Sequence, residues 1–314
     1  MIENPTVFVL GAGAHCSYGF PSGKNLKSEI IAAVNYSMHS KGEQSFDYLV
    51  RAGVAQSQET ESRRCSAFME ALYRSGQPSI DAFLNANKHQ LGFEIIGKAA
   101  IAQLLLAYEK TALQEWRNKE KHNDDWLTYL FERMLDGAHT PEEFSNRNYV
   151  SFITYNYDRF LEWWLHERIK NSFGLQDGAA LNILRKIPIH HMYGSLGNYP
   201  EWFKHDNSSW ISASCGIKTI FEAVHDPDAI ASAKKLLEQA RVICMLGFGY
   251  HWENISLIDL QSYLKEFKGR AASSRYDITN AEWSIIERLL PDSRIQSTNK
   301  DDQCLATLRN VEIF

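Results

Sequence analysis

The stretch TVFVLGAGAHCSYGFPSGKNL, Thr6 to Leu26, joins a β-branched apolar run to a small glycine loop. The run Thr6–Leu10 predicts a buried strand that ends at Gly11. The chain then turns polar, and we expect a helix from Gly23–Lys24 onward. A strand that passes through Gly-Ala-Gly into a helix gathers backbone N–H groups at a helix N-terminus, and this geometry binds phosphate. For Gly11–Gly13 taken alone, a tight turn without a ligand is the alternative.

Composition excludes several classes of partner. A chain of 314 residues with 44% hydrophobic residues can bury one large core or two modest ones. The net charge of −5 gives no general attraction to nucleic acid or to an anionic membrane, so we expect no direct nucleic-acid binding. No apolar run reaches the roughly 18 residues of a membrane helix, and the N-terminus lacks a secretion signal. We therefore expect a cytoplasmic protein without a membrane partner.

The cysteines and histidines give no metal-binding pattern. Five cysteines are scattered along the chain without a C-x-x-C pair, which predicts reduced, mostly buried thiols and excludes a cysteine-rich zinc module. The histidines at positions 190, 191 and 205 lack zinc-ligand spacing, and no carboxylate cluster joins them. We expect no metal.

The rest of the chain alternates strands and helices. The strand candidates after the first are Tyr149–Thr154, Lys186–Met192, Ala240–Phe248 and Arg294–Ser297. Residues 42–145 are almost wholly helical in pattern and are interpreted as a helical insertion. The prediction is one domain over residues 1–314, an α/β fold with a Rossmann-like parallel sheet, helices on both of its faces and this large insertion.

A Rossmann dehydrogenase fits the glycine loop poorly. The third glycine of Gly-x-Gly-x-x-Gly would fall at Cys16. The acidic residue that binds the ribose hydroxyls, expected about 20 residues further on at the end of a second strand, is missing. The next strand candidate begins only at Tyr149, so hydride transfer is not favoured.

Three further turns follow predicted strands. They lie within SFITYNYDRFLEWW (Ser151–Trp164), IHHMYGSLGN (Ile189–Asn198) and MLGFGYHWENISLI (Met245–Ile258). Asn156 and Asp158 project from the first of them, where either side chain can also serve simply as a helix cap. Turns that follow parallel strands meet at one edge of the sheet, where ligands bind in such folds.

Taken together, these stretches resemble the sirtuin-like family. GAGAHCSYGFP (Gly11–Pro21) is similar to its first NAD loop, and TYNYD (Thr154–Asp158) to its Thr-x-Asn-x-Asp element. MYGSLG (Met192–Gly197) is similar to its His-Gly-Ser element, and LGFGY (Leu246–Tyr250) to the late loop on the adenosine side. The resemblance implies NAD contacts from a set of loop residues: Gly11, Ala12, Gly13, Pro21, Asp158, Tyr193, Gly194, Ser195, Gly247, Phe248 and Gly249.

The departures from the family pattern point to one branch of it. His15 stands where the family usually has Ser, the Phe-Arg pair of protein deacylases is absent after Pro21, and no zinc ribbon exists. The bacterial sirtuin-like proteins of antiphage defence share these departures. The resemblance therefore implies an NAD hydrolase that depletes the cell of NAD during infection, and it allows a partner of the HerA-type hexameric ATPase kind.

The resemblance leaves the general base open. Tyr193 stands where the family has its catalytic histidine, and a phenol with a pKa of about 10 is a poor base at neutral pH. Two residues along an extended strand keep a side chain on the same face, so His191 can point into the same pocket while His190 faces away. We favour His191 with Asn156 as the catalytic pair, over Tyr193 as a positioning hydroxyl.

Other activities stay open at this point. ADP-ribosyl transfer or deacylation is the enzymatic alternative, and a module that senses NAD or ADP-ribose without chemistry is the non-enzymatic one. The helical insertion and the aromatic-rich C-terminal third offer more apolar surface than one NAD site needs. We therefore expect a homo-oligomer.

Overall fold

A six-stranded sheet, parallel throughout, forms the centre of the computed structural model, which describes residues 1–39, 58–117, 124–201, 203, 205, 209–289, 295–297 and 303–311. The strand order is β3-β2-β1-β4-β5-β6. The strands are β1 (Thr6–Leu10), β2 (Val150–Thr154), β3 (Ile189–His191), β4 (Val242–Leu246), β5 (Arg270–Ser273) and β6 (Ile295–Ser297).

The order of the strands reverses at β1. The chain adds β2 and β3 on one side of β1, then returns to add β4, β5 and β6 on the other. Leu10 pairs in register with Thr154 of β2 and with Leu246 of β4, so the three strands end at the same level. This is the Rossmann strand order, and ligands of such sheets bind beyond the carboxyl ends at the point of reversal.

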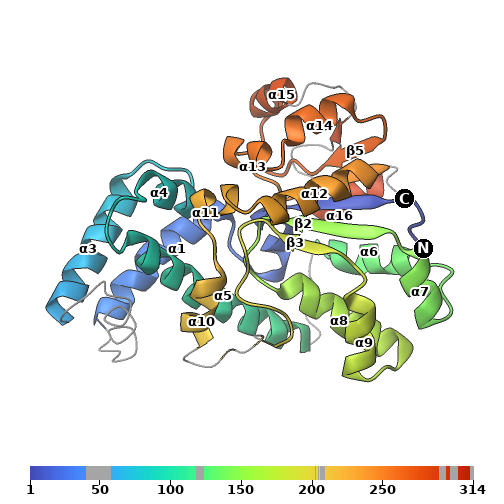
Figure 1. Ribbon diagram of the computed structural model, residues 1–314, viewed down its shortest axis with the longest axis horizontal. Coiled ribbons are helices and arrows are strands. Elements are labelled where there is room, and N and C mark those ends of the chain that lie inside the picture. The colour runs from blue at the N-terminus through green and yellow to red at the C-terminus, as the bar shows by residue number, and fades with distance from the viewer. Residues whose placement is uncertain are drawn as a thin grey trace.

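Helices cover both faces of the sheet (Figure 1). All residues of β1, β2 and β4 are buried, as continuous apolar strands between two helical layers require. The helices of the described residues are η1 (Ala12–Tyr18), α1 (Gly23–His39), α3 (Gln58–Arg74), α4 (Ile80–Ala86), α5 (Phe93–Arg117), α6 (Trp126–Leu135), α7 (Pro141–Arg147), α8 (Phe160–Phe173), α9 (Asp177–Leu184), α10 (Ser209–Gly216), α11 (Ile220–Val224), α12 (Pro227–Gln239), α13 (Trp252–Leu257), α14 (Leu260–Glu266), α15 (Asn280–Leu289) and α16 (Cys304–Asn310).

Local sequence signals fix several helix ends. Thr140 and Glu143 form a reciprocal capping box at the start of α7, with Pro141 at its first position. Asp226 accepts a hydrogen bond from the Ala229 N–H and so caps α12.

The predicted insertion divides into two parts. Helices α3, α4 and α5 join α1 in a lobe beside the sheet (Figure 1), where the Phe68 ring packs edge-on against Phe83 and Phe93. Helix α6 instead lies against the sheet, and its Trp126 ring packs against Phe8 of β1. Residues 42–57 and 118–123 of the predicted range lie outside the described residues.

The structure corrects two details of the C-terminal third. Strand β5 is absent from the sequence-based prediction, because its Arg-Ala-Ala-Ser composition carries no β-branched or aromatic signal. The stretch ENISLIDLQSYLKEF (Glu253–Phe267) predicts one helix after β4, but the chain forms α13 and α14 instead. Asp259, with a positive φ of 53°, separates the two helices.

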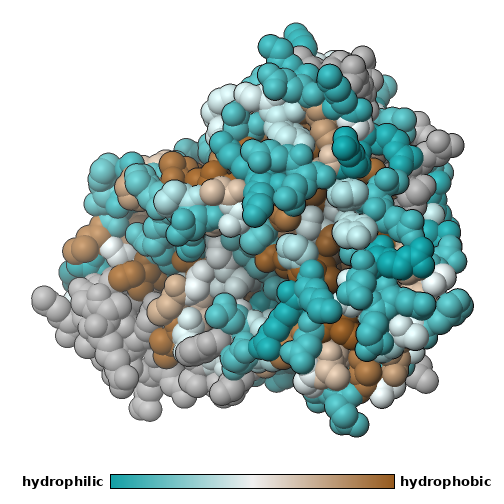
Figure 2. All heavy atoms as spheres, turned by 45° about the vertical axis from the view of Figure 1, so that its right-hand side comes forward, coloured by the Kyte–Doolittle hydropathy of each residue, from teal (hydrophilic) through white to brown (hydrophobic). Residues whose placement is uncertain are grey.

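The described residues contain no helix that is both long enough and apolar enough to cross a membrane. In Figure 2, hydrophilic residues cover most of the visible face, and hydrophobic residues gather in smaller groups, several of them over the helical lobe.

Candidate functional site

The two glycine loops at the point of strand reversal touch each other. A Cβ on Gly11 would lie 2.4 Å from the Gly247 carbonyl oxygen, and one on Gly13 would lie 2.8 Å from the Gly247 Cα. Gly247 itself has a φ of +57°, and a Cβ there would lie 1.9 Å from the Ala14 nitrogen. Glycine is therefore required at all three positions for the loops after β1 and β4 to pack together.

Most amides of the first loop are engaged within the protein. The Gly11 N–H donates to the Leu246 carbonyl at 3.0 Å, and the Gly13 N–H donates to the Gly247 carbonyl at 3.1 Å. The Ala14 N–H donates to the Gly11 carbonyl. The Ala12 N–H, at the first position of η1, makes no hydrogen bond among the described residues. Of the predicted phosphate-binding loop, Ala12 is thus the residue whose amide is available.

The turn after β2 lies beside η1. Its Asn156 N–H donates to the Thr154 hydroxyl at 3.1 Å, and Asp158 Oδ1 accepts a 3.2 Å hydrogen bond from the Phe160 N–H at the start of α8. Asp158 therefore does satisfy a helix amide. It also makes a contact that a capping role does not require, because the same oxygen lies 2.8 Å from His15 Nδ1.

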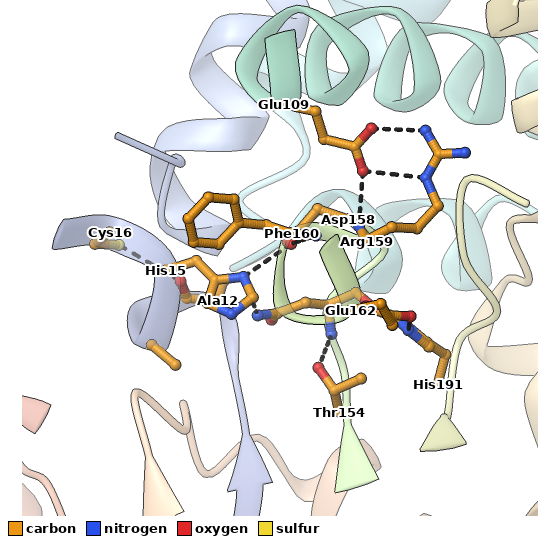
Figure 3. A network of polar contacts seen from close by, with 12 residues as sticks. Ala12, His15, Cys16, Glu109, Thr154, Asp158, Arg159, Phe160, Glu162 and His191 are labelled. Carbon is orange, nitrogen blue, oxygen red and sulfur yellow. Dashed lines mark hydrogen bonds and ion pairs between the residues drawn. The ribbon is translucent and has the colours of Figure 1, made fainter. Parts of the chain in front are cut away.

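His15 and Asp158 form a buried pair. Figure 3 shows the two side chains pointing toward one another from η1 and from the turn after β2. The side chain of His15 is 2% exposed and that of Asp158 5%. Burial alone would raise the pKa of Asp158, but the neighbouring His15 ring and the Phe160 amide together hold this pKa below its ordinary value. The carboxylate is therefore ionised at neutral pH.

Two polar atoms, one in this pair and one on the neighbouring Asn156, have no partner among the described residues. His15 Nε2 and Asn156 Oδ1 are both buried, and neither makes a hydrogen bond within the described residues. The Asn156 Nδ2 lies 3.4 Å from His15 Nδ1, so the two side chains are neighbours. An unsatisfied buried polar atom costs about 1–3 kcal/mol. Two of them at the carboxyl edge of a parallel sheet mark a place where a ligand can supply the missing partners.

His191 lies at the end of β3 with both ring nitrogens engaged. Nδ1 donates to the Asn156 carbonyl at 2.7 Å, and Nε2 contacts Glu162 Oε1 at 2.8 Å (Figure 3). Burial alone would lower the pKa of His191, but Glu162 and the carbonyl outweigh it and raise this pKa above its usual value. Two acceptors at the two nitrogens favour the doubly protonated ring.

Tyr193 belongs to an aromatic cluster at the same edge. Its hydroxyl donates to Asn254 Oδ1 at 2.6 Å, and Tyr155 donates to the Asn254 carbonyl at 2.7 Å. Burial raises the pKa of Tyr193 well above the ordinary phenol value. Phe248 packs against the Tyr155 ring with a centroid separation of 5.3 Å. The elements after β2, β3 and β4 therefore meet here, as the sequence predicts.

The remaining predicted residues differ in their contacts and in their burial. Gly194 has a φ of +67°, and a Cβ there would lie 2.0 Å from the Gly216 carbonyl oxygen. The Ser195 N–H donates to that same carbonyl at 3.1 Å. Pro21 is buried before α1, whereas Gly249 is exposed.

A buried ion pair anchors the β2 turn to the helical lobe. Arg159 directly follows Asp158, and its guanidinium contacts both carboxylate oxygens of Glu109 on α5, at 3.1 and 2.6 Å. Glu109 also accepts the Arg159 N–H at 2.7 Å and contacts His205 at 2.9 Å. Neither charged side chain is exposed. A second link joins Tyr157 to Asp81 of α4.

One group of potential metal ligands lies elsewhere. His166, Glu167 and Asp177 bring their ligand atoms within 4.8 Å of one another. Lys170 contacts Glu167 at 2.6 Å and Asp177 at 3.1 Å, so an ammonium already pairs with both carboxylates. His166 uses both ring nitrogens, one on Tyr199 and one on the Asp177 carbonyl. These contacts are those of a charge network rather than of an ion site.

The sequence-based assignment did not include His15 or Glu109. His15 was visible as a departure from the family pattern, and its position two residues after the loop glycine was the available signal. Glu109 carries no such signal, because an acidic residue on a long helix is ordinarily solvent-exposed.

The fold and the site define an α/β protein with the Rossmann strand order and a histidine–carboxylate pair at its ligand-binding edge. No protein-family model matches the sequence, and no curated protein is similar to it.

Proposed function

We propose that this protein is a sirtuin-like NAD hydrolase, which cleaves the bond between nicotinamide and ribose and acts as a cytoplasmic, NAD-depleting effector of bacterial antiphage defence. The observation that carries the proposal is the meeting of the four motif-bearing loops at the carboxyl edge of β3, β2, β1 and β4. Gly247 touches Gly13, Asp158 touches His15, and Tyr193 touches Asn254. A dinucleotide binds at this place in a sheet with this strand order.

The residues present suit NAD as substrate. The Ala12 amide at the start of η1 supplies a donor for the pyrophosphate. The unpartnered Asn156 Oδ1 supplies an acceptor for a ribose hydroxyl or for water without adding charge. The Tyr155 ring packs against the rings of Tyr193 and Phe248 at the same edge of the sheet.

The reaction needs orientation more than covalent help. The C1′–N bond breaks with its electron pair going to the nicotinamide nitrogen, so the leaving group departs as a neutral pyridine. Water adds to C1′ through an oxocarbenium-like transition state and loses one proton. The protein must hold the substrate, place one water and accept that proton.

The direct test is incubation of the purified protein with NAD, followed by separation of nicotinamide and ADP-ribose. We expect turnover by the wild-type chain and a loss of about 100-fold or more in Asn156→Ala. Asn171→Ala, an exposed asparagine on α8, is the matched control and keeps its turnover. Absence of turnover in the wild-type chain, alone and with its natural partner, rejects the proposal.

The products separate hydrolysis from its alternatives. Label transferred from NAD to protein indicates ADP-ribosyl transfer, and loss of an acyl group from a peptide indicates deacylation. A sensing module binds ADP-ribose without turnover, and its biological activity survives Asn156→Ala.

A toxic hydrolase requires control, and we propose that assembly provides it, as a homo-oligomer or with a HerA-type ATPase. Exposed apolar side chains on α11 and α13 support an assembled state: Phe221 is 45% exposed, Val224 54% and Trp252 57%. Light scattering that reports a monomer at micromolar concentration counts against the homo-oligomer.

A further inference from the structure

We infer that His15, held by Asp158, is the proton acceptor of this site, and that its Nε2 takes the proton of the attacking water. The inference rests on the proposed function and deepens it, because it assigns the base to η1 rather than to β3. It is independent of the family resemblance, which implies a serine at this position.

The orientation of the imidazole ring carries the assignment. Asp158 Oδ1 lies 2.8 Å from Nδ1, so an ionised Asp158 holds the tautomer with the proton on Nδ1. Nε2 then carries the lone pair, and this buried atom has no partner among the residues that the structure describes. The rings of Tyr18, Phe20 and Phe160 lie 5.6–6.3 Å from the His15 ring and fix its position.

The other candidates lack an available lone pair. His191 donates to a carbonyl through Nδ1 and contacts a carboxylate through Nε2, so both nitrogens are engaged in the protein. The Tyr193 hydroxyl is engaged with Asn254, and its burial opposes ionisation. Of the two histidines, His15 is the one with a carboxylate at one ring nitrogen and no partner among the described residues at the other.

The chemical step balances with these groups alone. The water oxygen bonds to C1′ as nicotinamide leaves with the electron pair of the broken bond. One water proton passes to His15 Nε2, and the resulting imidazolium is stabilised by the Asp158 carboxylate. The proton is later released to solvent, which restores the neutral ring. Asn156 Oδ1, on the neighbouring side chain, is placed to accept the other water hydrogen or a ribose hydroxyl.

The first measurement is made on the wild-type chain. Nitrogen-15 NMR of labelled histidine reports the tautomer of each ring, and the His15 signal is identified by its absence in His15→Gln. We expect a proton on Nδ1 and none on Nε2. A ring protonated on Nε2 alone overturns the inference whatever the variants do.

The second measurement separates binding from turnover. We expect kcat for NAD to fall about 10²–10⁴-fold in His15→Gln, with the affinity for ADP-ribose within threefold of wild type. Asp158→Asn is expected to lose kcat as well, because an amide no longer selects the tautomer. His139→Ala, an exposed histidine before α7, is the control and leaves both quantities unchanged.

The outcomes distinguish this inference from the proposed function. If the wild-type chain cleaves NAD and His15→Gln retains kcat within threefold, the assignment of the base is overturned and hydrolysis stands. Loss of turnover in His191→Gln or Tyr193→Phe, with His15→Gln unaffected, moves the base to that residue. If the wild-type chain neither binds ADP-ribose nor cleaves NAD, the proposed function fails and this inference fails with it.

Discussion

Two histidine–carboxylate pairs lie at the carboxyl edge of the sheet, one buried and one partly buried, and they differ in the second ring nitrogen. His15 contacts Asp158 through Nδ1, and its Nε2 has no partner among the described residues. His191 contacts Glu162 through Nε2 and a backbone carbonyl through Nδ1. A histidine paired with a carboxylate therefore keeps one ring nitrogen without a partner among the described residues in the first case and has both nitrogens engaged in the second. A histidine next to a carboxylate is therefore not by that fact a general base. It also needs a ring nitrogen whose lone pair is not already engaged.

Both pairs depend on the turn after β2. Asp158 belongs to that turn, and Asn156 in the same turn supplies the carbonyl that holds His191. The buried Arg159–Glu109 ion pair fixes the turn to α5. The helical lobe therefore sets the geometry of the site even though the lobe contributes no predicted catalytic residue.

The largest loss in the free energy of unfolding is expected from Glu109→Ala, which removes the anchor of the turn on which both pairs depend. The change takes the Glu109 carboxylate away from the buried Arg159 guanidinium, and breaking a buried ion pair in this way costs about 3–5 kcal/mol. Denaturant unfolding measures the loss. Glu201→Ala removes a partner of the exposed pair with Arg185 and is expected to stay within about 0.5 kcal/mol of wild type. Similar losses in the two variants would contradict the anchoring role.

An intermediate loss in the free energy of unfolding is expected from Gly247→Ala, which disturbs the His15–Asp158 pair but not the His191–Glu162 pair. The new Cβ would lie 1.9 Å from the Ala14 nitrogen, so η1 and His15 must shift. We expect a loss of about 2–3 kcal/mol in the free energy of unfolding. Gly174→Ala is the matched control, since its φ of +61° is similar but its Cβ would meet open space. Gly174→Ala is expected to cost only about 1–2 kcal/mol, the penalty of placing a residue with a Cβ in the left-handed backbone region. Equal losses would show that loop contact is unimportant.

The smallest effect concerns the His191–Glu162 pair alone. It is a dependence of the free energy of unfolding on pH. The folded-state pKa of His191 lies above its ordinary value. Its contribution to stability is therefore complete below the unfolded value of about 6.5 and is lost as the pH rises through the folded value. Glu162→Gln removes this contribution, which is on the order of 1 kcal/mol for a hydrogen bond to a charged group.

Unfolding curves at a series of pH values test this prediction. The difference in free energy between wild type and Glu162→Gln should shrink as the pH rises. The groups that face His191 are Glu162, Asp158, the Asn156 carbonyl and the neighbouring His190. Parallel pH profiles for the two chains would mean that His191 does not titrate in this range.

The strands show how much of the fold can be predicted from the sequence. β1, β2 and β4 are mainly apolar runs, and each forms where the sequence places it. β5 escapes prediction because Arg270–Ser273 becomes a strand only by pairing with β4 and β6. The parallel sheet and the carboxyl edge that gathers the motifs follow from alternation of strands and helices. The role of NAD stays a prediction from the resemblance.

The sequence by itself determined strands β1, β2 and β4, the order of the motif-bearing turns and the glycines that let two loops touch, because these depend on local backbone preference and hydrophobic periodicity. Only the tertiary structure decided which ring nitrogen is free and which carboxylate is buried. His15 and Asp158 lie 143 positions apart, and Arg159 and Glu109 lie 50 apart. Such contacts depend on side-chain orientation and on helix packing, and the chemistry of a histidine depends on them because its lone pair is either open or already engaged.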